Sequence, residues 1–208
     1  MKKLLLSLLL ALGITTASYA AAPAADPENT IYLDLQYGRV VIQLRPDLAP
    51  KHVARVKELV RKGFYDGLIF HRVIAGFMAQ TGDPTGTGMS GSGKTIPAEF
   101  TAEPFTRATV GAARSSDINS ADSQFFIMFD DNPSLNNQYT VWGKVTSGME
   151  FVDKIRKGEP PANPDKIVKM QIAADADKAS GAKGGAAAPA PAAAPAPAAA
   201  PAPAGDKK

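Results

Sequence analysis

The residues of this sequence that could do chemistry are a guanidinium, an amide and a group of apolar side chains. Arg72 is always protonated and offers several hydrogen-bond donors, and Gln80 can both donate to and accept from a peptide backbone. The apolar side chains are Phe77, Met78, Phe126 and Leu135. A fixed positive charge beside an apolar slot can stabilise electron density that builds up in a transition state, without any transfer of a proton.

Metal-dependent, acid–base and covalent catalysis find little support in the sequence. It has two histidines, His52 and His71, and no cysteine, and its carboxylates do not stand at zinc-ligand spacings. His52 is expected on an exposed helical turn, and His71 has no nearby motif such as Gly-x-Ser-x-Gly that would indicate an activated serine. We therefore expect an activity that uses neither a metal nor any other cofactor.

A glycine-rich segment carries two motifs that resemble nucleotide-binding loops. Gly86 to Gly91 matches a dinucleotide fingerprint, and Gly88 to Thr95 matches a phosphate-binding loop. Both motifs bind phosphate only where a strand precedes the loop and a helix follows it. Here Ile96 and Pro97 follow at once, and a proline disfavours helical backbone at the residue before it. We expect a flexible surface loop instead of a nucleotide site.

The elements that must position Arg72 and its neighbours are mostly short strands. Apolar and polar residues alternate over 31–36 and 39–44 around a glycine-containing turn, a pattern typical of a β-hairpin. Over 51–62 the period changes to that of a helix, which Gly63 can end. Further strands are predicted at 68–74, 77–81, 108–112, 123–129, 139–145 and 167–172, and a second helix at 149–157. Many short strands with only two helices favour an antiparallel sheet or barrel.

The segment from Phe70 to Asp83, FHRVIAGFMAQTGD, resembles the central signature of the cyclophilin family, FHRVIPGFMxQGGD. Other blocks follow in the order of that family: Gly82–Gly88, Ala98–Phe100, Ser123–Ile127 and Gly143–Val145. The resemblance extends from Ile31 to Ile172. It implies a mainly β fold, a closed antiparallel β-barrel of about eight strands capped by two α-helices, with the site on its outer face.

The resemblance also implies peptidyl-prolyl cis–trans isomerase activity. The barrier to this reaction is the partial double bond of the peptide, about 18–20 kcal/mol, so a donor that reaches the prolyl nitrogen lowers it by favouring loss of resonance. The implied catalytic residues are Arg72, Phe77, Gln80 and Phe126, and the implied substrate-binding residues are Met78, Leu135, Tyr139 and Ser115. Arg72 would donate to the prolyl nitrogen, and Gln80 would bind the substrate backbone or hold Arg72. Taken singly, the apolar residues would be ordinary core and Arg72 an exposed charge on a strand.

The sequence departs from the family pattern at several positions. Ser134 stands where many members have tryptophan, Tyr139 where they have histidine, Ser115 and Ser116 replace an Asn-Ala pair after Arg114, and Ala75 replaces the proline of the signature. None of these changes touches Arg72 or Gln80, so turnover is expected. Without the indole donor, the resemblance gives no basis for expecting tight binding of cyclosporin.

The two ends of the chain differ in composition from its middle. Lys2 and Lys3, an apolar run and Ser18-Tyr19-Ala20 are typical of a secretory signal peptide, with an uncleaved membrane anchor as the alternative. The predicted organisation is a signal peptide at 1–20, a short linker at 21–29, an isomerase domain at 30–173 and a disordered Ala/Pro-rich tail at 174–208. The tail could tether the domain or be merely solvated. The expected location is the periplasm, or else the protein is secreted.

Charge and composition limit the classes of molecule that are expected to bind. The formal net charge is +3, and without Lys2 and Lys3 the 21 basic residues nearly balance the 20 acidic ones. This small excess predicts no binding of nucleic acid, and no membrane contact is expected once the signal peptide is removed. The expected partners are proline-containing polypeptides, and the expected state is a monomer.

Two rival functions remain open at the level of sequence. One is a non-enzymatic proline-peptide binding module or chaperone that uses the same groove. The other is a structural barrel with an inactive site, displayed by its tail. Arg72 and Gln80 favour the enzyme, because binding alone could rely on the apolar slot.

Overall fold

The computed structural model describes residues 26–181, so the predicted signal peptide, most of the linker and most of the tail lie outside the described residues. The strands are β1 Thr30–Leu35, β2 Gly38–Leu44, β3 Arg72–Ile74, β4 Met78–Thr81, β5 Thr109–Ala112, β6 Phe125–Met128, β7 Val141–Ser147 and β8 Ile167–Ile172. The helices are α1 Pro50–Arg61, α2 Met149–Val152 and α3 Ala173–Gly181, with 3₁₀ turns at Pro27–Asn29 and Pro133–Leu135.

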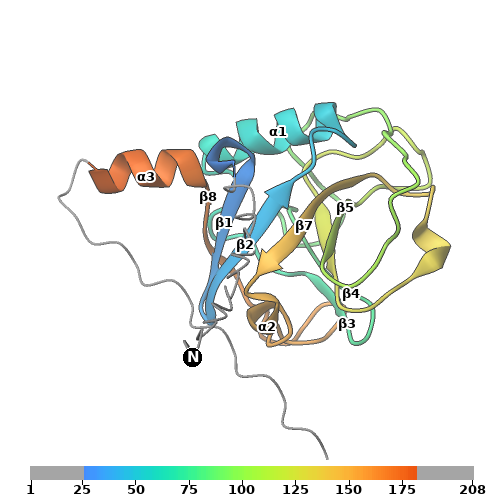
Figure 1. Cartoon of the computed structure of the whole chain (residues 1–208). Coiled ribbons are helices and arrows are strands. Elements are labelled where there is room, and N and C mark those ends of the chain that lie inside the picture. The colour runs from blue at the N-terminus through green and yellow to red at the C-terminus, as the bar shows by residue number, and fades with distance from the viewer. Residues whose placement is uncertain (1–25, 182–208) are drawn as a thin grey trace, which may run out of the picture.

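All eight strands join one antiparallel sheet in the order β3-β4-β6-β5-β7-β2-β1-β8. The sheet curls strongly, and α1 and α2 lie at opposite ends of it (Figure 1). Within residues 26–181 no ladder joins the edge strands β3 and β8. A bridge between Ile69 and Lys166 links the segments that precede them, and Phe70 N donates to Asp165 O at 2.9 Å. The structure is therefore a curled half-barrel, and the closed barrel expected from sequence is not shown.

The first predicted helix is confirmed, but its surroundings differ from the expectation at His52. The imidazole is buried with 1% exposure, and its Nδ1 lies 2.7 Å from Glu99 Oε2. Ala49 precedes α1 and offers no side-chain cap, so the Glu99 carboxylate accepts hydrogen bonds from the N–H groups of Lys51 and His52 instead. The prediction of an exposed His52 was wrong because this cap comes from a residue far away in sequence.

The other helices also differ from the prediction. α2 ends at Val152, where the chain tightens into i→i+3 hydrogen bonds, and it does not continue to residue 157. α3 occupies the start of the predicted disordered tail and extends away from β8 (Figure 1). Alanine has the highest helix propensity, and no proline follows Ala173 until Pro189, which explains why this part is helical. No helix among residues 26–181 is long and apolar enough to cross a membrane.

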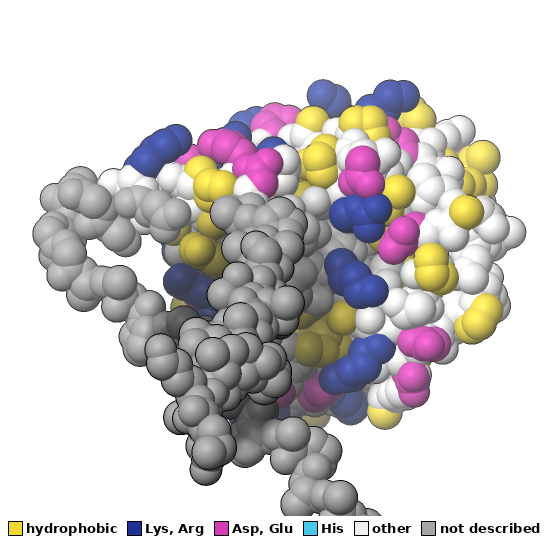
Figure 2. Space-filling view, in the orientation of Figure 1, with side chains coloured by type: hydrophobic (Ala, Val, Ile, Leu, Met, Phe, Trp, Pro, Cys, Tyr) yellow, Lys and Arg dark blue, Asp and Glu magenta, His cyan; other side chains and the backbone are white. Residues whose placement is uncertain are grey.

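The visible surface carries charges of both signs. Lys and Arg side chains are interspersed with Asp and Glu on the face drawn in Figure 2. Among residues 26–181, charged side chains form ion pairs such as Arg39 with Asp34 at 2.7 Å and Arg107 with Asp153 at 2.7 Å. This face therefore presents no broad patch of one sign.

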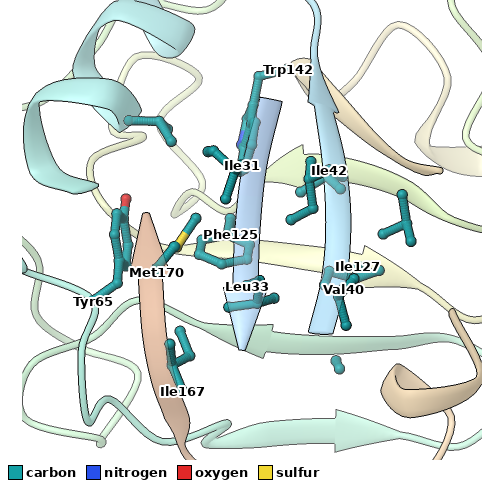
Figure 3. Packing of buried hydrophobic residues seen from close by; sticks show 14 of the residues in the cluster. Ile31, Leu33, Val40, Ile42, Tyr65, Phe125, Ile127, Trp142, Ile167 and Met170 are labelled. Atoms are coloured by element: carbon teal, nitrogen blue, oxygen red, sulfur yellow. The ribbon is translucent and has the colours of Figure 1, made fainter. Parts of the chain in front are cut away.

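The main core fills the inside of the curled sheet. Side chains from β1, β2, β6, β7 and β8 meet there, and Figure 3 labels Ile31, Leu33, Val40, Ile42, Tyr65, Phe125, Ile127, Trp142, Ile167 and Met170. Each buried apolar side chain contributes about 1.5–3 kcal/mol. Strand β6 is apolar on both faces, because Phe125 and Ile127 join this core while Phe126 and Met128 join a second cluster on the other face. The candidate site lies over that second cluster.

Candidate active site

A hollow of about 120 Å³ lies on the outer face of the sheet and gathers most of the predicted site residues. Its lining consists of Arg72, Phe77, Met78, Gln80, Ala113, Arg114, Phe126, Leu135 and Tyr139. Seven of the eight predicted residues line it, and Ser115 does not. Sequence reasoning had identified Arg114 only as a departure from the family pattern and had not singled out Ala113.

Strand register explains why residues distant in sequence meet in this hollow. Arg72 on β3 pairs with Gln80 on β4, and Gln80 pairs with Phe126 on β6. Residues directly opposite each other in an antiparallel sheet project from the same face, with Cβ atoms about 4.5–5.5 Å apart. The three side chains thus form a row across three neighbouring strands. Gly111 is the next residue of this row, on β5.

The floor of the hollow is apolar and closely packed. Met78 and Phe126 are buried, with 1% and 5% exposure, and both belong to the second cluster. The Phe126 ring stacks on Phe105 at 5.8 Å between centroids and meets Tyr139 edge to face, also at 5.8 Å. Gly111 leaves space for this packing, because a Cβ there would lie 2.6 Å from Phe126 Cζ. The floor is a preformed apolar slot suited to a small ring.

The guanidinium of Arg72 stands at the rim of this slot. Its Nε donates a hydrogen bond to Glu159 Oε2 at 2.8 Å. Both side chains are about half-exposed, 41% for Arg72 and 51% for Glu159. Sequence reasoning missed Glu159, because it belongs to the loop before β8 and no motif marks it.

Gln80 is held from the opposite side. Its Nε2 donates to Gln124 Oε1 at 2.9 Å, and Gln124 Nε2 donates to the carbonyl oxygens of Gly88 at 3.0 Å and Ser90 at 2.8 Å. The sequence left two roles open for Gln80, to bind the substrate backbone or to hold Arg72. In the structure the Gln80 side chain hydrogen-bonds Gln124 and not Arg72. Gln80 is tied to the glycine-rich loop, which leaves its own carbonyl oxygen, Oε1, with no intramolecular donor among the described residues.

Arg114 closes the hollow beside Tyr139. Its guanidinium lies 4.6 Å from the centroid of the Tyr139 ring, within the range of a cation–π contact. Its Nη2 donates to Gln138 O at 2.9 Å and its Nη1 to Ser115 O at 2.8 Å. These bonds hold the guanidinium in place, so Arg114 forms a wall of the slot and supplies a second positive charge.

Ser115 lines a second, larger hollow of about 390 Å³ that adjoins the first. The two hollows share Gln80, Ala113 and Arg114. Ser115 Oγ is within 2.7 Å of Ser120 Oγ, and the opposite wall comes from the glycine-rich loop. A chain seated in the first hollow could therefore continue into the second.

The loop that bears the nucleotide-like motifs is a wall of this groove. It is followed by an isolated bridge between Ile96 and Ala121, and not by the helix that phosphate binding requires. Asp83 organises the start of the loop. Burial alone would raise the pKa of Asp83, but hydrogen bonds from the Thr85 N–H and hydroxyl and from the Ser90 N–H lower that pKa to about 2.

The groove offers electrostatic and apolar contacts, and no histidine is among the residues that line its two hollows. His71 follows Phe70 beneath the loop and is buried with 5% exposure, and burial lowers the pKa of its ring. It does not line either hollow, and neither does His52. The chemistry open to this arrangement is stabilisation of a charge distribution by Arg72 above an apolar slot.

Comparison with known proteins agrees with this geometry. Residues 30–172 match the family described as cyclophilin type peptidyl-prolyl cis-trans isomerase/CLD. The chain belongs to the cyclophilin family. The "Probable peptidyl-prolyl cis-trans isomerase" of Brucella suis is 56% identical, over 78% of this chain and 92% of its own length. Peptidyl-prolyl cis-trans isomerase B of Bacillus subtilis is 42% identical, over 63% of this chain and 93% of its own.

Solved cyclophilin structures resemble the fold as well. A cyclophilin from Hirschia baltica aligns with a TM-score of 0.68 and 29% identity, covering 73% of this chain and 76% of its own. A Cryptosporidium parvum cyclophilin, solved in the presence of the dipeptide Ala-Pro, aligns with a TM-score of 0.64, covering 69% of this chain and 98% of its own. The cyclophilin resemblance inferred from the sequence is confirmed, and the protein is a cyclophilin-family peptidyl-prolyl cis–trans isomerase.

Proposed function

We propose that this cyclophilin isomerises X–Pro bonds in exported polypeptides by a non-covalent mechanism, with the proline ring in the slot above Phe126 and the Arg72 guanidinium at the prolyl nitrogen. The observation that carries the proposal is the row formed by Arg72, Gln80 and Phe126 on neighbouring strands. In this row a hydrogen-bond donor, Arg72, a polar amide, Gln80, and an apolar ring, Phe126, line one hollow of about 120 Å³. The Ala-Pro dipeptide used with the Cryptosporidium relative supports a proline-containing ligand.

Binding in this scheme is mainly apolar. The pyrrolidine ring would rest on Phe126 and Met78, with Phe77, Leu135 and Tyr139 around it, which shields the imide from water. The carbonyl oxygen of Gln80, which accepts no hydrogen bond from residues 26–181, can accept one from the substrate backbone. The residues that precede proline would extend past Arg114 into the hollow lined by Ser115.

The rate enhancement in this scheme comes from the twisted transition state. When the peptide C–N bond rotates, resonance is lost and the lone pair localises on the prolyl nitrogen. Arg72 donates to that nitrogen more strongly in the twisted state than in either planar state, so the interaction lowers the barrier and not merely the energy of binding. A millionfold acceleration requires a barrier lower by about 8 kcal/mol, to which Arg72 is one contributor.

The most direct test compares wild type with R72A and R72K in a protease-coupled assay on a proline tetrapeptide. Loss of one preorganised donor costs about 3 kcal/mol, so R72A should lose about 10²-fold in kcat/KM. R72K keeps the charge without the planar fork and should lose about tenfold. The matched control is R39A, which removes an exposed, ion-paired arginine from β2 and should leave turnover at the wild-type level. Equal rates for R72A and wild type would contradict the mechanism.

The binding-module hypothesis makes a different prediction. A protein that only grips proline segments would bind the tetrapeptide without accelerating exchange between its cis and trans NMR signals. The family match favours exchange, and the R72A variant should retain binding, because the apolar slot is intact, while exchange is lost.

Location and assembly belong to the proposal too. We base export to the periplasm on the pattern of residues 1–20, and fractionation of cells that express the full chain tests it. The mixed charges of the face in Figure 2 support a protein that does not bind nucleic acid. A monomer is proposed, with size-exclusion chromatography of the mature chain as its test.

A further inference from the structure

The contact between Arg72 and Glu159 is the feature of the groove that the preceding scheme leaves unused. Arg72 Nε and Glu159 Oε2 are 2.8 Å apart. Among the side chains of residues 26–181, that of Glu159 alone hydrogen-bonds the Arg72 guanidinium. Gln80, the neighbour of Arg72 in the row, donates to Gln124 instead.

The position of Glu159 is set by the backbone and not by chance contact of two long side chains. Gly158 N donates to Val73 O and Val73 N donates to Gly158 O, both at 2.8 Å. This reciprocal pair fixes Glu159 beside the residue that precedes Val73, which is Arg72. Val73 is buried in the main core with 1% exposure, so the anchor is attached to that core.

Gly158 itself is required by this anchor. Its φ is +149°, and a Cβ there would lie 2.5 Å from Pro161 Cα. Backbone atoms cannot yield as a flexible side chain does, so a residue other than glycine would displace the loop at this point. The Glu159 carboxylate is therefore presented to Arg72 by a segment that the Val73–Gly158 hydrogen bonds anchor and that needs glycine at position 158.

We propose that Glu159 is a positioning residue for Arg72, which holds the Nε edge of the guanidinium so that the Nη groups face the proline slot. The inference rests on the role of Arg72 proposed above. An arginine side chain that is 41% exposed has many rotamers, and immobilising it in advance removes an entropic cost from the transition state. Because the guanidinium is planar, one bond at Nε also restricts the direction of both Nη groups.

A carboxylate so close to Arg72 has an opposing effect, since it weakens the positive potential felt by the substrate. Both side chains are about half-exposed, and water screens charges strongly at such sites, so this loss is small. Orientation comes from the directed hydrogen bond between Arg72 Nε and Glu159 Oε2 at 2.8 Å, which forms at low salt and weakens as added salt screens the pair. We therefore expect a net gain in kcat from Glu159, with little effect on substrate binding, which the apolar slot provides.

The test measures kcat and KM separately for E159A and E159Q in the full chain. E159A should lower kcat about three- to fivefold, the upper part of the range of an exposed ion pair, with KM changed by less than about twofold. E159Q keeps the length and one acceptor oxygen and should recover most of the lost kcat. The matched control is D153N, which neutralises another exposed acid paired with an arginine at 2.7 Å, but away from the groove, and should behave as wild type.

The dependence of kcat on salt concentration distinguishes positioning of Arg72 by Glu159 from a purely structural role of Glu159. Salt screens exposed ion pairs, so wild-type kcat should fall toward the E159A value as salt rises, while E159A and E159Q should change little. Unchanged or raised kcat in E159A, or an effect confined to KM, would overturn the inference. A wild-type protein with no activity, or an R72A variant equal to wild type, would instead overturn the proposed mechanism, so the two failures are distinguishable.

Discussion

Adding a single methyl group beside the floor of the proline slot, with G111A, should impair catalysis from the neighbouring strand β5, on the same face of the sheet. Gly111 on β5 lies directly across from Phe126 on β6. Its new Cβ would lie 2.6 Å from Phe126 Cζ and 2.7 Å from Phe105 Cε1. Ordinary carbon–carbon contacts are about 3.5–4.0 Å, so both rings must give way by about 1 Å.

The expected losses of stability and of kcat/KM depend on how far the Phe126 and Phe105 rings are displaced. Overpacking of this kind costs about 1–3 kcal/mol, which lowers the melting temperature by about 2–10 °C for a domain of this size. Phe126 forms the floor of a hollow of only about 120 Å³, so its displacement intrudes on the space for proline. A displacement near 1 Å at a catalytic group can cost up to about 10²-fold, and we expect kcat/KM to fall at least about tenfold, mainly through KM.

The assay pairs thermal unfolding with steady-state kinetics on a proline tetrapeptide, at a temperature where all variants are folded. The matched control is V110A on the same strand, because Val110 faces the main core and not the slot. V110A should lose about 1–3 kcal/mol of stability yet keep KM near the wild-type value. A G111A protein with lowered stability but wild-type KM and kcat would refute the packing argument.

Two further predictions concern stability and the tail. Burial lowers the pKa of His52 below its ordinary 6.5, despite the Glu99 contact. The unfolded state therefore binds a proton at this imidazole more readily than the folded state does. The free energy of unfolding should decrease as pH falls from about 7 to 5. Urea unfolding at pH 7 and pH 5 should show this decrease in wild type and much less of it in H52N, and a wild-type stability independent of pH over this range would contradict it. Deleting residues 182–208 should leave kcat/KM within about twofold, because every residue of the groove lies between 72 and 159, and a larger loss would support a role for the tail in the activity.

Much of the site was predictable because its residues come in local blocks. Arg72, Phe77, Met78 and Gln80 lie in one motif of fixed spacing, and Phe126 lies in another. Alternation of apolar residues predicted the β1–β2 hairpin, which the register from Thr30 to Leu35 confirms. Neither block by itself predicts that Phe126 lies beside Arg72 and Gln80. That proximity was inferred from the resemblance to a known family.

The contacts that sequence analysis missed all join residues far apart in the chain. Glu99 caps α1 and buries His52, and Glu159 reaches Arg72 through a loop anchored on Val73. Carboxylates pair with partners of many kinds on a surface, so no local pattern distinguishes these two from the other acids. The helix α3 was missed for a different reason, since alanine-rich composition was interpreted as part of the disordered tail.

The sequence alone determined the chemistry available to this protein and its family, because both depend on residue types at short, regular spacings. It contains a permanently charged donor, an amide and apolar rings in recognisable blocks. Only the tertiary structure decided how they face one another: strand register aligned Arg72, Gln80 and Phe126, and loop anchors brought Glu159 to the guanidinium. The physical reason is that side-chain direction is a local property of a strand, whereas the partner across a sheet or a loop depends on how the whole chain packs.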